Sequence, residues 1–151
     1  MENIRELVQI AVGNKPADLL LRNCRVIDVF TGKIEKRDLA IARGYVVGYG
    51  DYEAEEVVDL KGSYVAPSLI DAHIHIESTM LTVDEFARAV VPHGTGAVIA
   101  DPHEFANVSG KRGIEYLLKK REDFPIDIFV MAPSCVPATP FDHSGHILRA
   151  A

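Results

Sequence analysis

The spacing of apolar and polar residues changes near residue 64 of this 151-residue chain. Before that point, apolar residues at helical spacing stop at Gly13 and predict a short amphipathic helix. Its apolar members are Ile4, Leu7, Val8 and Ala11. Strand-like runs follow at residues 19–29, 38–43, 45–50 and 56–60. Because turn signals such as Arg43-Gly44 and Lys61-Gly62 separate these runs, the segment predicts a small antiparallel β unit.

After residue 64 the pattern predicts strands that alternate with helices. The segment "YVAPSLIDAHIHIE" reads as a strand, and Thr82 opens a helix as the N-cap of a capping box with Glu85. Residues 96–101 form a continuous apolar run, which is typical of a strand buried on both faces of a parallel sheet. Ser109 is the predicted cap of a second helix, and residues 126–132 are a third strand. The order βαβαβ predicts a parallel α/β domain.

The first of these strands carries a metal-binding pattern. Alternate strand residues point to opposite faces, so Asp71, His73, His75 and Glu77 share one face while Ala and Ile fill the other. Two imidazoles at i and i+2 can bind one transition metal, and Asp71 and Glu77 can orient those ligands or contact substrate. The competing interpretation is an edge strand with one solvated face, because HxH alone is a short pattern.

Polar residues also gather where the second and third strands end. The second is followed by "ADPHEFAN", in which Asp101 and Glu104 are candidates for contacting substrate or supporting ligands, with His103 a weaker candidate that reads as solvated. The third is followed by the Pro-rich "APSCVPATP". In a barrel of parallel strands the active site lies at the carboxyl ends of the strands, so this distribution favours the metal interpretation.

The remaining cysteine and histidine residues do not predict a second catalytic or metal-binding site. Cys24 and Cys135 have no metal-type spacing and read as buried thiols in a reducing compartment. The Ser-Gly between His143 and His146 indicates a loop rather than a metal-binding helix. His93 reads as a charge partner at a helix C-terminus.

Composition and charge narrow the class of protein. The net charge of −6 argues against a nucleic-acid partner, which requires a basic face. The N-terminus lacks the apolar core of a signal peptide, and no apolar run is long enough to span a bilayer. We therefore expect a cytoplasmic protein with neither a nucleic-acid nor a membrane partner.

Longer motifs carry a family resemblance. The segment "DAHIHIEST" after its "AP-LID" lead-in resembles the first barrel strand of the amidohydrolase superfamily of metal-dependent hydrolases. The stretch from "HIESTMLTVDEF" to "ADPHEFANVSG", followed by "DIFVMAPSCVPATPFDHSG", is similar to the adenine deaminase family within that superfamily. This resemblance covers essentially the whole chain.

The resemblance implies a fold and a reaction. It implies an α/β fold: residues 67–151 as the first β/α units of an incomplete (β/α)8 barrel, preceded by residues 1–66 as a helix and part of a β-sandwich subdomain. It implies the hydrolysis of adenine to hypoxanthine and ammonia at a binuclear manganese or iron centre, with His73 and His75 as first-strand ligands. The remaining ligands and the catalytic residues are expected downstream of Ala151, and the complete enzyme is expected to be a homo-oligomer.

Two alternatives and one departure from the family pattern remain. The chain is alternatively a non-catalytic truncated fragment, or part of another cyclic amidine or amide hydrolase. Since a whole barrel needs roughly 250 residues, the chain reads as an N-terminal piece that is inactive alone. The departure is Ser68, which stands where family members carry glycine and would be strained if the backbone there needs a positive φ.

Overall fold

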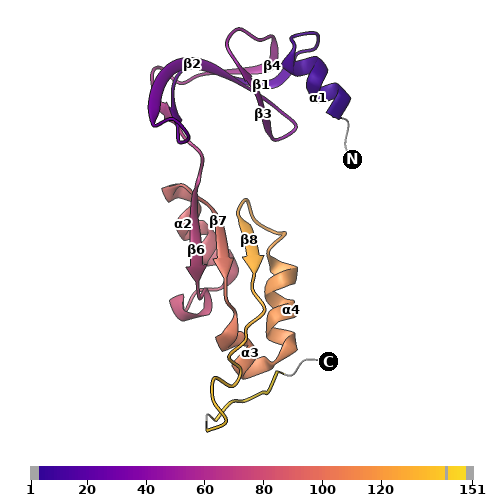
Figure 1. The fold of residues 1–151 in the computed structure, drawn as a ribbon, viewed down its shortest axis with the longest axis vertical. Helices are drawn as coiled ribbons and strands as arrows, with labels where there is room; N and C mark the ends of the chain where they lie inside the picture. The colour runs from indigo at the N-terminus through magenta and orange to yellow at the C-terminus, as the bar shows by residue number, and fades with distance from the viewer. Residues whose placement is uncertain (1–3, 142, 149–151) are drawn as a thin grey trace. The chain divides into compact units, whose positions relative to one another are not determined.

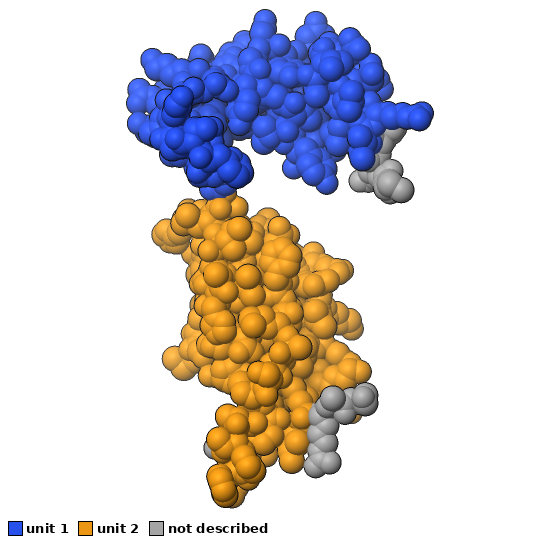
Figure 2. Space-filling model, in the orientation of Figure 1, with its two compact units in different colours: residues 1–67 blue, residues 68–151 orange. Residues whose placement is uncertain are grey.

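A computed structural model describes residues 4–141 and 143–148 as two compact units, residues 1–67 and residues 68–151 (Figure 2). The helices and strands of the N-terminal unit are α1 (Ile4–Ala11), β1 (Ala17–Asp28), β2 (Lys33–Ala42), β3 (Tyr45–Tyr49), β4 (Ala54–Asp59) and β5 (Tyr64–Val65). Those of the second unit are β6 (Leu69–Ile74), η1 (Glu77–Thr79), α2 (Val83–Val90), η2 (Val91–His93), β7 (Thr95–Ala100), α3 (His103–Ser109), α4 (Lys111–Lys120) and β8 (Asp127–Val130).

The sheet of the N-terminal unit is mixed, so the expectation of an antiparallel unit is wrong in part. Its strand order is β3-β2-β1-β4, and β5 also pairs with β1. The hairpins β1–β2 and β2–β3 are antiparallel, but β4 and β5 run parallel to β1. Parallel pairing needs a crossover, and the chain makes one by passing through β2 and β3 before it returns to the other side of β1.

Left-handed residues make the tight turns of this unit at the positions that the sequence indicates. Arg43 and Gly44 both have positive φ, 52° and 78°, which suits the two-residue turn between β2 and β3. Lys61 and Gly62 repeat this pattern before β5. Asn23 also has a positive φ of 56° and lies in a register shift of β1, so it makes a bulge inside a long strand.

The core of this unit lies between the sheet and α1. Leu20 and Ala40 are fully buried with Ile10 from the helix, and Leu7 packs against them. The predicted helix is confirmed, but its predicted face is wrong in part, because Ile4 and Val8 are exposed. The Tyr52 hydroxyl donates to the Ala11 carbonyl at 2.8 Å, so a C-terminal carbonyl of α1 is satisfied from the sheet side. Cys24 is buried in a neighbouring cluster, and this burial raises the pKa of its thiol.

The second unit has the parallel α/β order that the sequence predicts. Strands β6, β7 and β8 pair in sequence order and are all parallel. Their arrows point the same way in Figure 1, and α3 lies beyond their tips. Its hydrophobic core is formed by Ile76, Val83, Phe86, Ala87, Val98, Ala100, Leu117, Ile126 and Ile128.

Two helix starts test the capping predictions. Thr82 is the N-cap of α2 and accepts a hydrogen bond from the Glu85 N–H at 3.4 Å, as predicted. The reciprocal half of the capping box is not formed, because the Glu85 carboxylate accepts from Arg88 instead. The Ser109 cap is wrong: Ser109 is the last residue of α3, and Gly110, with φ 60°, separates α3 from α4. The stretch between β7 and β8 therefore holds two helices rather than the one that the sequence predicts, and the first, α3, begins at His103.

Ser68 has no positive φ, so the strain considered for this departure does not arise. Its side chain instead occupies the space beside Gly96 on β7, where an added Cβ would lie 2.5 Å from Ser68 Cβ. A glycine on one strand therefore accommodates the serine on the next, which explains how the chain tolerates a larger residue here.

The edge strands of the second unit expose apolar side chains. Ile70, expected on the packed face, is 67% exposed, and Phe129 of β8 is 58% exposed. Burial of this alternating face begins later in the segment, with Ile74 partly buried and Ile76 fully buried. No helix in the described part of the chain has the length and apolarity needed to cross a membrane.

Candidate metal centre

Two histidines and an aspartate meet at the carboxyl ends of β6 and β7. His73 lies in β6, His75 follows its last residue, and Asp101 follows the last residue of β7. The strands are parallel neighbours, so their carboxyl ends lie at one edge of the sheet. Glu77 does not continue the alternation, because the strand gives way to the 3₁₀ turn η1 at Glu77.

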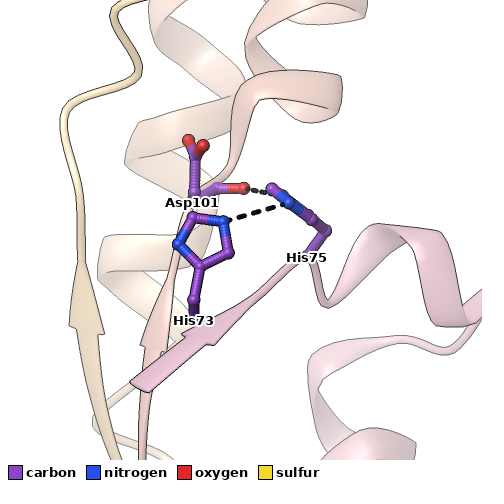
Figure 3. Close-up of side chains that lie close together, drawn as sticks. All are labelled: His73, His75 and Asp101. Carbon is purple, nitrogen blue, oxygen red and sulfur yellow. Dashed lines mark hydrogen bonds between the residues drawn. The ribbon is translucent and has the colours of Figure 1, made fainter. Parts of the chain in front are cut away.

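The two imidazoles present their Nε2 atoms to one point. The Nε2 atoms are 3.3 Å apart, and the rings meet edge to face with centroids 4.9 Å apart (Figure 3). Two nitrogens bound at about 2.1 Å to one cation lie roughly 3.0–3.5 Å apart in tetrahedral or octahedral geometry. The separation therefore fits two ligands of a single divalent cation.

A backbone carbonyl fixes the orientation of His75. Its Nδ1 lies 2.9 Å from the Asp101 carbonyl oxygen, which only accepts hydrogen bonds. The neutral ring must therefore carry its proton on Nδ1, and the Nε2 lone pair is left for a cation. Figure 3 shows this carbonyl turned toward His75, with the Asp101 carboxylate directed elsewhere.

Asp71 supports the backbone rather than the rings. Its Oδ1 accepts a hydrogen bond from the His73 N–H at 3.1 Å, and the residue is exposed. That contact holds the strand in the irregular stretch where the pairing of β6 and β7 shifts between Asp71 and Ile74. The shift coincides with the segment that carries the first histidine.

Glu77 connects the ends of the two strands. Its Oε1 accepts hydrogen bonds from the backbone N–H groups of Glu104 and Phe105, at 3.1 and 3.4 Å. It therefore caps α3, which lies far along the chain, rather than α2, the next helix. Its second oxygen, Oε2, is buried without a hydrogen-bond partner.

Glu104 is the exposed member of this group. Its carboxylate accepts a hydrogen bond from the Ser78 hydroxyl at 2.8 Å, which joins η1 to α3 a second time. Glu77 and Ser78, both in η1, thus form hydrogen bonds with the start of α3. These bonds fix the position of the segment that carries Asp101 and Glu104.

Sequence reasoning misjudged the surroundings of two neighbours of this site. The His103 ring lies edge to face against His75, with centroids 4.5 Å apart, so it is half-buried rather than solvated. Cys135 is exposed, which corrects the expectation of a buried thiol, and it lies close to Asp101 and His103. Its place after the third strand was the available signal, because strand ends of one parallel sheet converge. His143 and His146 lie outside any helix, as predicted.

The chain matches a known protein family and curated proteins over much of its length. The model of the amidohydrolase family matches residues 64–150. The chain is 50% identical over 150 residues to adenine deaminase 2 of Carboxydothermus hydrogenoformans, covering 99% of this chain and 26% of that protein. It is 52% identical over 144 residues to the adenine deaminase of Kosmotoga olearia, covering 95% and 25%. The chain thus spans about a quarter of the length of these curated relatives.

Solved structures support the fold. A D-aminoacylase described as defining a subset of amidohydrolases has a TM-score of 0.62 at 19% identity, over 78% of this chain and 30% of its own. A second D-aminoacylase structure, from work on its binuclear metal centre, has a TM-score of 0.59 at 18% identity, with the same coverage. At this identity the likeness concerns the fold alone.

Proposed function

The chain belongs to the amidohydrolase family, and from this premise we propose that it forms part of an adenine deaminase. The reaction is the hydrolysis of adenine to hypoxanthine and ammonia, in which water adds oxygen at C6 and the C6–N bond breaks. The observation that supports adenine is the 50% identity to an adenine deaminase over 150 residues. The proposal concerns the whole protein, of which these residues correspond to about a quarter.

The second unit forms the beginning of a (β/α)8 barrel in this proposal. Three parallel strands in sequence order, with helices in the connections, are the repeating unit of such a barrel. The exposed apolar residues of β6 and β8 are then the faces that later strands and helices cover. The mixed sheet of residues 1–67 is part of a β-sandwich subdomain.

His73 and His75 hold the first cation of a binuclear centre, with manganese or iron as the native metal. A divalent cation there supplies Lewis acidity, which brings the pKa of water into the neutral range. His75 is held for this role by the Asp101 carbonyl, which keeps its Nε2 available. Glu77 maintains the geometry by joining η1 to α3, so that both strand ends keep their spacing.

Asp101 and Glu104 are side chains of this chain that contact the substrate or support the metal ligands. Both lie at the carboxyl end of β7, where a barrel presents its reacting groups. A carboxylate can accept the exocyclic or ring N–H groups of a purine. The carboxylate that moves the proton to the departing ammonia, and the further metal ligands, come from the other three quarters of the enzyme.

The setting of this activity follows from its substrate. Adenine is a free nucleobase, so its deamination belongs to purine salvage in the cytoplasm. The complete enzyme is a homo-oligomer and needs neither nucleic acid nor membrane as a partner.

A chimera tests the proposal. Residues 1–151 replace the matching quarter of the Kosmotoga olearia enzyme, and ammonia release from adenine is measured with manganese present. We expect the chimera to be active, and the same chimera with His75→Asn to lose activity by at least about 1000-fold, because a metal ligand is absent. His93→Asn, at an exposed position, is the matched control. A folded, metal-loaded chimera that releases no ammonia would contradict adenine as the substrate.

A further inference from the structure

A second set of ligand atoms lies beside the histidine pair. Asp101, His103 and Cys135 bring a carboxylate oxygen, a ring nitrogen and a sulfur within 4.8 Å of one another. Asp101 and His103 follow β7, and Cys135 lies in the segment after β8. The group is therefore assembled by the parallel pairing of β7 with β8, from residues more than thirty positions apart.

Two atoms of this group are buried without hydrogen-bond partners. Asp101 Oδ1 and His103 Nδ1 have almost no access to solvent. The contact between Asp101 Oδ2 and His103 Nδ1, at 3.5 Å, is too long for a good hydrogen bond. Burying such a group without a hydrogen-bond partner is unfavourable, so a ligand that pairs with both atoms is favoured.

We propose that Asp101, His103 and Cys135 form a second cation site, which binds zinc or a similar borderline divalent cation through one oxygen, one nitrogen and one sulfur. Thiolate and imidazole donors favour zinc and cobalt over manganese and magnesium, which prefer oxygen ligands. When Cys135 binds, its thiol proton passes to solvent, since thiolate is the ligand form.

The site is open on one side. Cys135 is exposed, and a pocket of about 360 Å³ is lined by His103, Cys135, Asn107 and His143, among others. A cation can therefore approach from the pocket on the side of Cys135 and His103, and a fourth position remains for water or a small ligand. Three protein ligands with one open position is the arrangement of reactive rather than closed structural zinc sites.

The site differs from the histidine pair in what it takes from Asp101. The backbone carbonyl of Asp101 orients His75, whereas the second site takes the Asp101 carboxylate, which also lies within 4.8 Å of the ligand atoms of His73 and His75. The proposal therefore needs neither His73 nor His75, and it does not depend on adenine as the substrate. Its distinguishing mark is the sulfur, which the histidine pair lacks.

Alkylation of the two cysteines tests the site in the unmodified chain. The metal-free protein is treated with iodoacetamide, and each cysteine is followed by mass spectrometry with zinc, manganese or neither. We expect zinc to slow the alkylation of Cys135 by roughly tenfold or more, because a metal-bound thiolate reacts poorly with iodoacetamide. Manganese should have little effect on this rate. Cys24, buried in the other unit, is the internal reference.

Cobalt substitution identifies the ligands. Cobalt added to the metal-free chain should give a thiolate-to-cobalt charge-transfer band, which Cys135→Ser removes. Cys24→Ser, the matched control, should keep the band, as should His75→Asn. His103→Asn should weaken cobalt binding at this band by more than the roughly 10–100-fold that loss of an outer-sphere partner costs.

Four results overturn the proposal. One is a Cys135 alkylation rate that zinc leaves unchanged, and another is equal zinc protection of Cys24. The third is a charge-transfer band that persists in Cys135→Ser, and the fourth is the absence of this band from the wild-type chain at saturating cobalt. If the chimera releases no ammonia while the wild-type chain still shows the cobalt charge-transfer band, the deaminase proposal alone is rejected.

Discussion

The carboxylates of the two units have different surroundings. In the N-terminal unit the carboxylates at the turns accept hydrogen bonds from nearby backbone and side-chain groups. In the second unit, two carboxylates at the strand ends each keep a buried oxygen without a partner, Glu77 Oε2 and Asp101 Oδ1. Among the described residues of the N-terminal unit, no carboxylate oxygen is left in this state.

Asp59 and Asp28 are two hydrogen-bonded carboxylates of the N-terminal unit. Asp59 Oδ1 accepts from the Asn23 side chain and the Lys61 N–H, both at 2.9 Å, and these bonds lower its pKa. The Thr31 hydroxyl, together with the Phe30 N–H, lowers the pKa of Asp28 in the same way. Hydrogen bonds to the charged form favour it, so these carboxylates hold turns in place.

The difference separates structural polar groups from binding groups. A carboxylate that is hydrogen-bonded at an exposed turn needs no ligand to compensate for burial. A buried oxygen without a partner is costly, and a fold retains it where a ligand compensates. The N-terminal unit has one comparable atom, Arg25 Nε, but that guanidinium donates to the Tyr64 hydroxyl through Nη1.

Loss of one histidine of the pair should have the largest effect, which is on cation affinity. His75→Asn removes one of two converging nitrogens, so we expect the affinity for manganese to fall by more than about 100-fold. Equilibrium dialysis of the chain measures this. His93→Asn should leave the affinity unchanged, because His93 is exposed at the end of η2. Equal affinities in the two variants would show that the histidine pair does not hold the cation.

A packing change should come next in size. Gly96→Ala places a methyl group against Ser68, and overpacking of this kind costs about 1–3 kcal/mol of unfolding free energy. Urea denaturation measures the loss. Ser68→Gly combined with Gly96→Ala should recover most of it, since the space is restored. A double variant no more stable than Gly96→Ala would mean that Ser68 is not the obstacle.

Removal of the Glu77 connection should have a smaller effect on stability. Glu77→Ala leaves the first N–H groups of α3 uncapped, so we expect a loss of about 1 kcal/mol. Cation affinity should fall by roughly 10–100-fold, because the strand ends are no longer tied. Glu115→Ala, which breaks an exposed ion pair with Lys111, is the control and should change neither quantity appreciably. Unchanged cation affinity in Glu77→Ala would limit this residue to capping.

The smallest effect concerns Asp59 and depends on pH. A carboxylate with a lowered folded pKa stabilises the fold above its unfolded pKa, about 3.9, and loses this contribution as the pH falls through the folded pKa. Asp59→Asn should therefore be slightly less stable than the wild type at pH 7, and the difference should vanish in acid. Urea titrations at pH 7 and in acid measure it. A difference that persists in acid would point to packing rather than charge.

Local patterns were sufficient where neighbours in sequence decide the structure. The spacing of residues 4–11, the Arg43-Gly44 turn and the Thr82 cap all depend on contacts within a few residues. The prediction of Ser109 as a cap failed because Gly110, with its positive φ, breaks the helical segment one residue later. The direction of β4 and β5 was also missed, because strand pairing depends on residues distant in sequence.

The sequence by itself determined the parallel α/β order of the second unit and identified His73 and His75 as a pair on one strand, because periodicity is a local property. Only the tertiary structure decided what surrounds them. The Asp101 carbonyl that orients His75, the cap that Glu77 provides for α3, and the approach of Cys135 to His103 all join different strand ends. Those contacts depend on the register of β6, β7 and β8, which no short segment specifies.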